Sequence, residues 1–263
     1  MDYQLFVEGL PELYLDWGLP TARPKAPQFG SVLEKVQGMT SPGVLQLLNR
    51  AVDFLGPGEL YAEVGSFQGA TLIGALLGHP EKLAWAVDNS AEFDPAGQNF
   101  ARLQQNLADF GLGSQVVFHN MDLEEFFLTG PAGPGKIGAY FLDGPHDYRS
   151  QLLGLLLARP FLAEQALMVV DDYNWGMVRQ SVWDFLAVQP EARLLGEWPT
   201  PGNCHPSFWN GVAVLAWDGR QRNNYTWPDF HRARQKPFLE SLYLLQQFQL
   251  RREGNTIRIK RTQ

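Results

Sequence analysis

Short apolar runs alternate with longer amphipathic segments from residue 59 onward. Five of these runs have the length and the β-branched or aromatic content of buried strands, and each precedes a segment with helical character: residues 60–65, 83–88, 115–119, 137–143 and 166–172. Strands that alternate with helices are typical of βαβ units and of a largely parallel sheet. The pattern therefore predicts an α/β fold.

Two more β-like runs, residues 191–198 and 210–217, flank a stretch rich in proline and glycine. We expect them to form an antiparallel hairpin at the edge of the sheet. Together with the five earlier strands they predict a doubly wound, mostly parallel seven-stranded sheet with an antiparallel C-terminal hairpin and helices on both faces.

Helical patterns surround these strands. We expect helices over residues 41–56, 176–188 and 237–253, and another that is capped by Asp94, has Pro95 in its first turn and ends at Gly111. Residues 1–50 are interpreted as an N-terminal extension with lead-in helices, residues 51–218 as the core domain and residues 219–263 as a C-terminal helical extension.

Composition and charge narrow the possible partners. The 263 residues are 45% hydrophobic and 19% charged, which is typical of a globular protein, and the net charge is −7. This charge argues against nucleic acid or anionic lipid as the main partner and favours a small molecule. A single cysteine excludes an internal disulfide and a multi-thiolate metal site. With no basic leader and no uninterrupted apolar span, we expect a cytoplasmic protein that does not enter the membrane and could form a homodimer.

The first predicted strand runs into a glycine-containing turn, EVGSFQG, at residues 63–69. In open α/β sheets such a turn faces the ligand. A dinucleotide site would require a glycine where Phe67 stands, and the lysine and Ser/Thr of a phosphate-binding loop are missing. The turn therefore favours a ligand without phosphates.

Two acidic residues follow later strands. Asp88 ends the second strand, about 20 residues past the glycines, where an acid accepts hydrogen bonds from ribose hydroxyls. Asp122 follows the third strand and is placed to receive an amino group such as that of adenine. A nucleoside without phosphate suggests S-adenosylmethionine.

The segments EVGSFQG, NMDLEEF, FLDGPHDY and VVDDYNW, together with Asp88, resemble a class I S-adenosylmethionine-dependent methyltransferase over residues 55–217. The D-G-x-H-x-Y pattern followed by an Asp-Asp pair is similar to the small-molecule O-methyltransferase branch that includes the macrocin O-methyltransferases. The resemblance implies a Rossmann-like fold. It also implies cofactor contacts from residues of these motifs: Glu63, Gly65 and Gly69 to the methionine part, Asp88 to ribose and Asp122 to adenine, with Ser66 and Asp143 as further contacts.

Carboxylates also gather at the ends of the fourth and fifth strands. Asp143, Asp171 and Asp172 could hold a hard divalent ion, Mg²⁺ before Mn²⁺, although adjacent strand residues point to opposite faces and Asp172 could instead cap a helix. Asp143 and His146 are the candidate catalytic residues, with His146 as a general base or as a metal ligand beside Asp143. A histidine that only fixes its own loop is the alternative.

These residues predict transfer of a methyl group from S-adenosylmethionine to a hydroxyl of a small molecule, such as a sugar, a natural product or a phenol, with possible help from a divalent ion. Two alternatives remain. His146, Asp143 and Asp172 could hold ferrous iron in an oxygenase-type enzyme. The chain could also be a non-catalytic nucleoside-binding or scaffold protein. From its position alone, the segment 37–41 could close over the cofactor.

Overall fold

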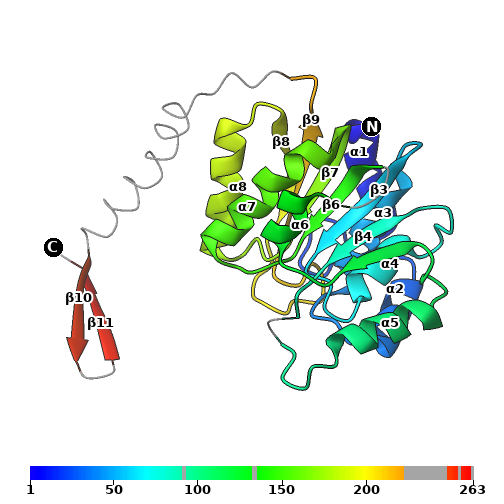
Figure 1. Ribbon diagram of the computed structural model, residues 1–263. Coiled ribbons are helices and arrows are strands. Elements are labelled where there is room, and N and C mark those ends of the chain that lie inside the picture. Colours follow the sequence, from blue (N-terminus) through cyan, green and yellow to red (C-terminus); the bar gives the residue numbers. More distant parts are fainter. Residues whose placement is uncertain (91–92, 132–134, 222–247, 254–255, 262–263) are drawn as a thin grey trace.

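A seven-stranded sheet forms the centre of the protein in a computed structural model, which describes residues 1–90, 93–131, 135–221, 248–253 and 256–261. The strand order is β5-β4-β3-β6-β7-β9-β8 (Figure 1). Strands β3 to β7 are parallel to one another, whereas β9 runs antiparallel to both β7 and β8. The predicted doubly wound, mostly parallel sheet with its antiparallel hairpin is confirmed. Its strands are β3 (Glu59–Val64), β4 (Ala84–Val87), β5 (Val116–His119), β6 (Lys136–Leu142), β7 (Leu162–Val170), β8 (Ala192–Trp198) and β9 (Val212–Asp218).

Helices cover both faces of this sheet. Because successive strand residues point to opposite faces, Tyr61 joins one hydrophobic core while Leu60 and Ala62 join the other. The first core is closed by α1 (Tyr3–Leu13), α2 (Gln28–Lys35), α3 (Pro42–Asp53), α4 (Ala70–Leu76) and α5 (Asn99–Asp109). The second is closed by α6 (Leu123–Thr129), α7 (Tyr148–Ala158) and α8 (Gly176–Val188).

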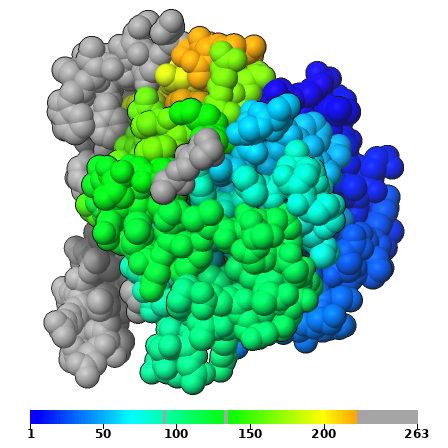
Figure 2. Space-filling model, turned by 45° about the vertical axis from the view of Figure 1, so that its right-hand side comes forward, coloured from blue at the N-terminus to red at the C-terminus, as the bar shows by residue number. Residues whose placement is uncertain are grey.

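The N-terminal segment packs along one side of the molecule, shown in blue in Figure 2. It contains a short antiparallel pair, β1 (Tyr14–Leu15) and β2 (Arg23–Pro24). The Tyr14 hydroxyl donates to the Gly43 carbonyl at 2.8 Å, and Ser41 Oγ donates to the Ser207 carbonyl at 2.6 Å. Helices α1 to α3 thus share a core with the sheet, and Ser41 connects them to the β8–β9 loop.

Two helix predictions differ from the structure. Helix α5 begins at Asn99 rather than in the turn after Asp94, because the Asp94 carboxylate accepts from the backbone N–H groups of Gln98 and Asn99 at 2.7 and 3.1 Å and holds the intervening residues as a turn. The expected helix over 237–253 is also wrong at its end. Residues 248–253 form strand β10 (Phe248–Glu253), which pairs antiparallel with β11 (Thr256–Arg261). Residues 237–247 lie outside the described part.

The carboxyl ends of β3, β4, β6 and β7 meet at one edge of the sheet. A 3₁₀ turn, η1 (Arg159–Phe161), connects α7 to the amino end of β7, at the opposite edge of the sheet. The loops at the carboxyl edge carry the polar residues discussed below. Among the described helices, none combines the length and the apolar character needed to cross a bilayer.

Candidate active site

The turn from β3 to α4 requires glycine at two positions. Gly65 has φ +89°, and a Cβ there would lie 1.8 Å from the carbonyl oxygen of Asp143. Gly69, with φ +88°, caps α4, and its Cβ would lie 2.7 Å from a methyl group of Leu103. Positive φ strains any other residue, and both positions also lack room for a side chain. Gly65 therefore brings the β3 loop directly against the end of β6.

A pocket of about 920 Å³, mouth included, opens at this edge of the sheet. Six segments contribute: the stretch before α3, the β3–α4 turn, the loop after β4, the loop after β6, the residue Asp172 after β7, and the residues just before β9. The lining residues are Gly38, Met39, Thr40, Gly65, Ser66, Phe67, Ala70, Thr71, Asp88, Asn89, Phe93, Asp143, Gly144, Pro145, His146, Asp172, Trp209 and Asn210.

Asp88 holds two loops at the pocket wall. Its Oδ2 accepts from the backbone N–H of Phe67, and its Oδ1 accepts from that of Ser90, both at 2.7 Å. Phe67 and Ser90 have φ values of +45° and +51°, so these hydrogen bonds stabilise an unusual backbone. Each carboxylate oxygen has a further lone pair, which leaves Asp88 able to accept from a ligand hydroxyl.

Glu63 lies beneath the turn and does not line the pocket. Its side chain is fully buried, and Oε2 accepts from the Tyr61 hydroxyl at 2.7 Å. Burial raises the pKa of Glu63 to about 7, while the nearby hydroxyls of Tyr61, Thr71 and Ser66 act in the opposite direction. Glu63 thus supports the turn from below, and its carboxyl group changes its charge near neutral pH.

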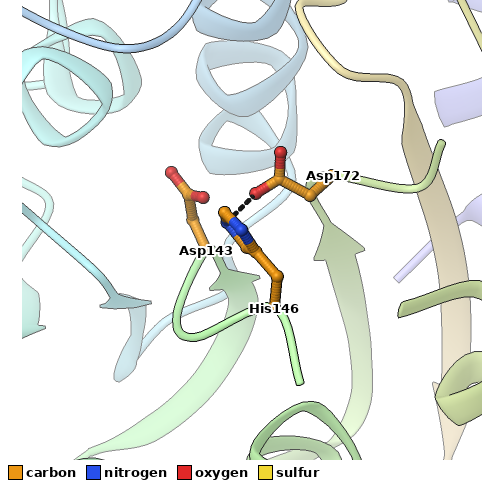
Figure 3. Close-up of side chains that lie close together, drawn as sticks. All are labelled: Asp143, His146 and Asp172. Carbon is orange, nitrogen blue, oxygen red and sulfur yellow. Dashed lines mark ion pairs between the residues drawn. The ribbon is translucent and has the colours of Figure 1, made fainter. Parts of the chain in front are cut away.

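Asp143, His146 and Asp172 form a compact cluster on the other side of the pocket. Figure 3 shows the three side chains, which follow β6 and β7, pointing toward one another. A ligand atom from each lies within 4.8 Å of the others, and His146 Nε2 is 2.6 Å from Asp172 Oδ2. Asp172 Oδ1 accepts from Asn210 Nδ2, also at 2.6 Å. We call these three residues the acidic cluster.

Burial and neighbouring negative charges act together at the acidic cluster. The loss of contact with bulk water raises the pKa of Asp143, and the charges of Asp171, Asp172 and Glu63 raise it further. A bound cation would reverse this effect by favouring the charged carboxylate. A positively charged ligand would therefore be bound favourably at the acidic cluster.

Besides Glu63, three of the expected site residues lie outside the pocket lining: Gly69, Asp122 and Asp171. Asp171 is 1% exposed and Asp172 turns the chain with φ +57°, so the two adjacent carboxylates do not share the cluster. Neither oxygen of Asp171 has a hydrogen-bond partner among the described residues. Asp122 is exposed and caps α6 by accepting from the Glu124 N–H, and Gly69 serves the turn.

The structure also decides whether Asp172 caps a helix, and it shows how the residues of the β8–β9 loop are placed. Helix α8 is capped at Trp175 without a side-chain hydrogen bond, so Asp172 is not its cap. Cys204 is exposed, while His205 Nδ1 lies 2.8 Å from Ser207 Oγ. These two neighbours do not form a nucleophilic pair.

Several pocket residues could not be assigned from sequence. Met39 and Thr40 precede α3, Asn210 lies before β9, and Phe93 follows β4. Trp175 stacks on His146 with ring centroids 5.4 Å apart. Only the segment 37–41 gave a signal, through its position in the chain. The contacts depend on loop folding, which periodicity does not encode.

Comparisons with known proteins agree with this architecture. A family model described as a methyltransferase domain matches residues 62–173. An O-methyltransferase from Bacillus cereus, solved in complex with S-adenosylhomocysteine, aligns with a TM-score of 0.56 and 14% identity over 74% of this chain and 92% of that one. The O-methyltransferase TomG from Streptomyces achromogenes, involved in tomaymycin synthesis and solved with S-adenosylmethionine, aligns with a TM-score of 0.51 and 15% identity. This alignment covers 83% of this chain and 90% of that one. No curated protein matches the sequence.

The sheet order, the glycine turn and the pocket at the carboxyl edge define a Rossmann-like domain with the fold of class I methyltransferases. The match of residues 62–173 to a methyltransferase-domain model confirms the resemblance to class I S-adenosylmethionine-dependent methyltransferases that the sequence predicts. The macrocin O-methyltransferase branch stays a prediction, since identities of 14–15% establish a shared fold and not a shared substrate.

Proposed function

We propose that this protein transfers a methyl group from S-adenosylmethionine to a hydroxyl of a small molecule, with assistance from a divalent ion, Mg²⁺ before Mn²⁺. One observation carries the proposal. The Gly65 turn, Asp88 and the acidic cluster line a single pocket at the carboxyl edge of the sheet. A cofactor held by the first two would therefore reach an acceptor at the third.

The pocket walls suit the cofactor. Gly65 leaves its backbone bare where a side chain would fill the space, and Asp88 offers acceptor lone pairs for ribose hydroxyls. No lysine or arginine is among the lining residues of the described chain, so a pyrophosphate would find no cationic partner. A sulfonium, which is positively charged, fits a wall made of carboxylates. Asp122 remains a proposed adenine contact, at the exposed start of α6.

The acidic cluster suits a divalent ion. Asp143 and Asp172 supply carboxylate oxygens and His146 supplies a ring nitrogen, a donor set compatible with Mg²⁺ or Mn²⁺. When bound, such an ion lowers the pKa of a hydroxyl group that approaches it. In this proposal His146 takes the ligand position for which Asp171 was a candidate, because Asp171 is buried away from the pocket lining.

The side chains of the cluster also have roles of their own. Asp172 accepts from Asn210 and is paired with His146, so it fixes the imidazole at the pocket surface. When its ring nitrogen is not bound to the ion, His146 is instead the residue placed to take the proton of the acceptor hydroxyl as the methyl group is transferred. The fixed pocket aligns the sulfonium methyl with that oxygen, and alignment of this kind can contribute about 7–11 kcal/mol.

A second function is favoured by the same cluster. One histidine and two carboxylates form the ligand set of ferrous oxygenases, and Asp143, His146 and Asp172 have this composition. The glycine turn and Asp88 have no role in that chemistry, which is why methyl transfer is preferred. A scaffold protein without turnover is the remaining alternative, and it predicts no dependence of activity on any of these residues.

Calorimetric titration with S-adenosylhomocysteine, with and without Mg²⁺, tests the proposal before any acceptor is identified. We expect saturable binding that Mg²⁺ leaves intact or strengthens, and no binding of NADH. The matched variant Asp143→Asn should keep the shape of the site while weakening its response to Mg²⁺. Binding of NADH without binding of the sulfur nucleoside would contradict the proposal. Binding of Fe²⁺ in strong preference to Mg²⁺ would favour the oxygenase.

A further inference from the structure

The charge of the pocket restricts which acceptors it can take. Three carboxylates line it, those of Asp88, Asp143 and Asp172, and none of its described lining residues is a lysine or an arginine. The adjoining residues 91 and 92, whose placement is not described, are alanine and glutamate in the sequence and add no positive charge. The histidine in the lining, His146, is already paired with Asp172 at 2.6 Å.

Bound S-adenosylmethionine and a bound divalent ion do not give the pocket a net positive charge that would attract an anion. A sulfonium contributes one positive charge and a divalent ion two, and these face the three lining carboxylates. Glu63 and Asp171 are buried beside the pocket and supply no positive charge. The fully loaded pocket is therefore neutral or negative. An acceptor anion would lose its hydration without gaining a cationic partner, and removal of an unpaired charge from water is costly.

The lining also contains four large apolar side chains, three of which are aromatic rings. Met39, Phe67, Phe93 and Trp209 line the pocket, and Met39 and Phe93 are 42% and 61% exposed at the described surface. Next to them, Trp175 stacks on His146 and is 44% exposed. Aromatic and thioether groups at the mouth of a pocket favour a ring-shaped body with little charge.

Building on the proposed function, we propose that the acceptor is an uncharged or positively charged ring compound that carries a hydroxyl group, and that the site rejects acceptors with a carboxylate or phosphate. Nucleotides, RNA and acyl-coenzyme A thioesters belong to the rejected class because each brings several negative charges to the pocket. The charge of the lining carries this selection, while the rings at the mouth accept the body of the acceptor.

Two sets of matched compounds test the inference by calorimetric titration into protein saturated with S-adenosylhomocysteine and Mg²⁺. The first set is 3,4-dihydroxybenzaldehyde, dopamine and 3,4-dihydroxybenzoate. The second is methyl glucoside, glucosamine and glucuronate. Within the set that the pocket accepts, we expect the carboxylate to bind at least about tenfold more weakly than the neutral and cationic members, which corresponds to about 1.4 kcal/mol.

A charge-introducing variant gives the converse test. Met39→Lys places an ammonium group at the pocket mouth, and Leu128→Lys places one on α6 at a position that is 72% exposed and outside the lining. The first substitution should strengthen binding of the carboxylate about tenfold relative to the neutral member of its set, whereas the second should leave this ratio unchanged. Equal or tighter binding of the carboxylates by the unmodified protein, or failure of every neutral and cationic member to bind, would overturn the inference. Failure of the proposed function is distinct, because S-adenosylhomocysteine itself would then not bind.

Discussion

Asn210 donates from Nδ2 to Asp172 Oδ1 at 2.6 Å and, through its own Oδ1, accepts from the backbone N–H of Cys204 at 2.8 Å. It thereby fixes an acidic-cluster carboxylate to the β8–β9 loop. Ser207 of the same loop accepts from Ser41, so the loop also holds the segment before α3. The acidic cluster, the β8–β9 loop and the N-terminal lead-in thus form one connected wall of the pocket.

We predict that Asn210→Ala weakens divalent metal binding. Groups that orient metal ligands typically contribute about 10-fold to 100-fold in affinity, and here Asp172 would lose the donor that sets its orientation. Titration of Mn²⁺ followed by electron paramagnetic resonance measures the effect. Gln105→Ala, which removes a side-chain hydrogen bond to Asp109 on the exposed surface of α5, is the control and should leave Mn²⁺ affinity unchanged. Equal Mn²⁺ affinity in the two variants would show that Asn210 is only a loop contact.

His146→Gln should separate catalysis from cofactor binding. We expect the rate of methyl transfer to fall by about 10²-fold to 10⁴-fold, because the group that takes the hydroxyl proton is lost. Affinity for S-adenosylhomocysteine should change by no more than about a factor of two, because in this proposal His146 acts on the acceptor and does not hold the cofactor. His79→Gln is the control: its Nε2 lies 3.6 Å from Asp53, a similar histidine–carboxylate pair outside the pocket lining. A parallel loss of cofactor affinity in His146→Gln would instead place this residue in cofactor binding.

The strands and the ends at which the polar residues gather could be predicted from sequence. Apolar runs of four to seven residues followed by Asp88 or Asp143 already indicate parallel strands with a polar carboxyl edge. The grouping of side chains at that edge could not be predicted in full. Whether Asp171 or Asp172 turns toward the pocket depends on the positive φ of Asp172, and that single dihedral is set by tertiary packing.

Local capping signals also had limits. Asp94 lies five residues before Asn99, the first residue of α5, and its carboxylate reaches the N–H groups of Gln98 and Asn99 across a turn. The sequence pattern of a capping acid followed by proline fits both arrangements. Similarly, the periodic apolar residues around 248 fit a helix, whereas residues 248–253 pair with 256–261 as strands. Short apolar segments are ambiguous in this way when packing decides.

Gly65→Ala should abolish cofactor binding. A matched variant separates the two reasons why glycine is needed there, its positive φ and the close approach of the Asp143 carbonyl. At Gly65 the added Cβ meets the Asp143 carbonyl at 1.8 Å and φ is +89°; at Gly78 φ is +84° and nothing lies within 4 Å. Gly78→Ala should therefore cost only the backbone strain, about 1 kcal/mol, and keep full affinity for S-adenosylhomocysteine. Gly65→Ala must in addition push β3 and β6 apart. Urea unfolding and calorimetry measure both effects, and equal behaviour of the two variants would contradict the close approach seen at the pocket.

Glu63 should make the stability of the protein depend on pH near neutrality. In the folded chain burial raises the pKa of Glu63 from its ordinary value of 4.5 to about 7. Between these two values the folded state binds more protons than the unfolded state, so the free energy of unfolding falls as the pH rises, and the stabilising contribution is lost above pH 7. The full difference is about 3 kcal/mol.

Glu63→Gln keeps the shape of the side chain and cannot titrate, so its unfolding free energy should decline less steeply over the same range. Urea unfolding at closely spaced pH values between 4.5 and 8 compares the two proteins, and parallel curves would contradict a raised pKa. Tyr61→Phe removes the hydroxyl that favours the charged carboxylate, so the decline should extend to higher pH. A sulfonium bound above the turn would favour the same charge. S-adenosylmethionine should therefore flatten the pH dependence of the unmodified protein more than the uncharged S-adenosylhomocysteine does, and should have no such effect on Glu63→Gln.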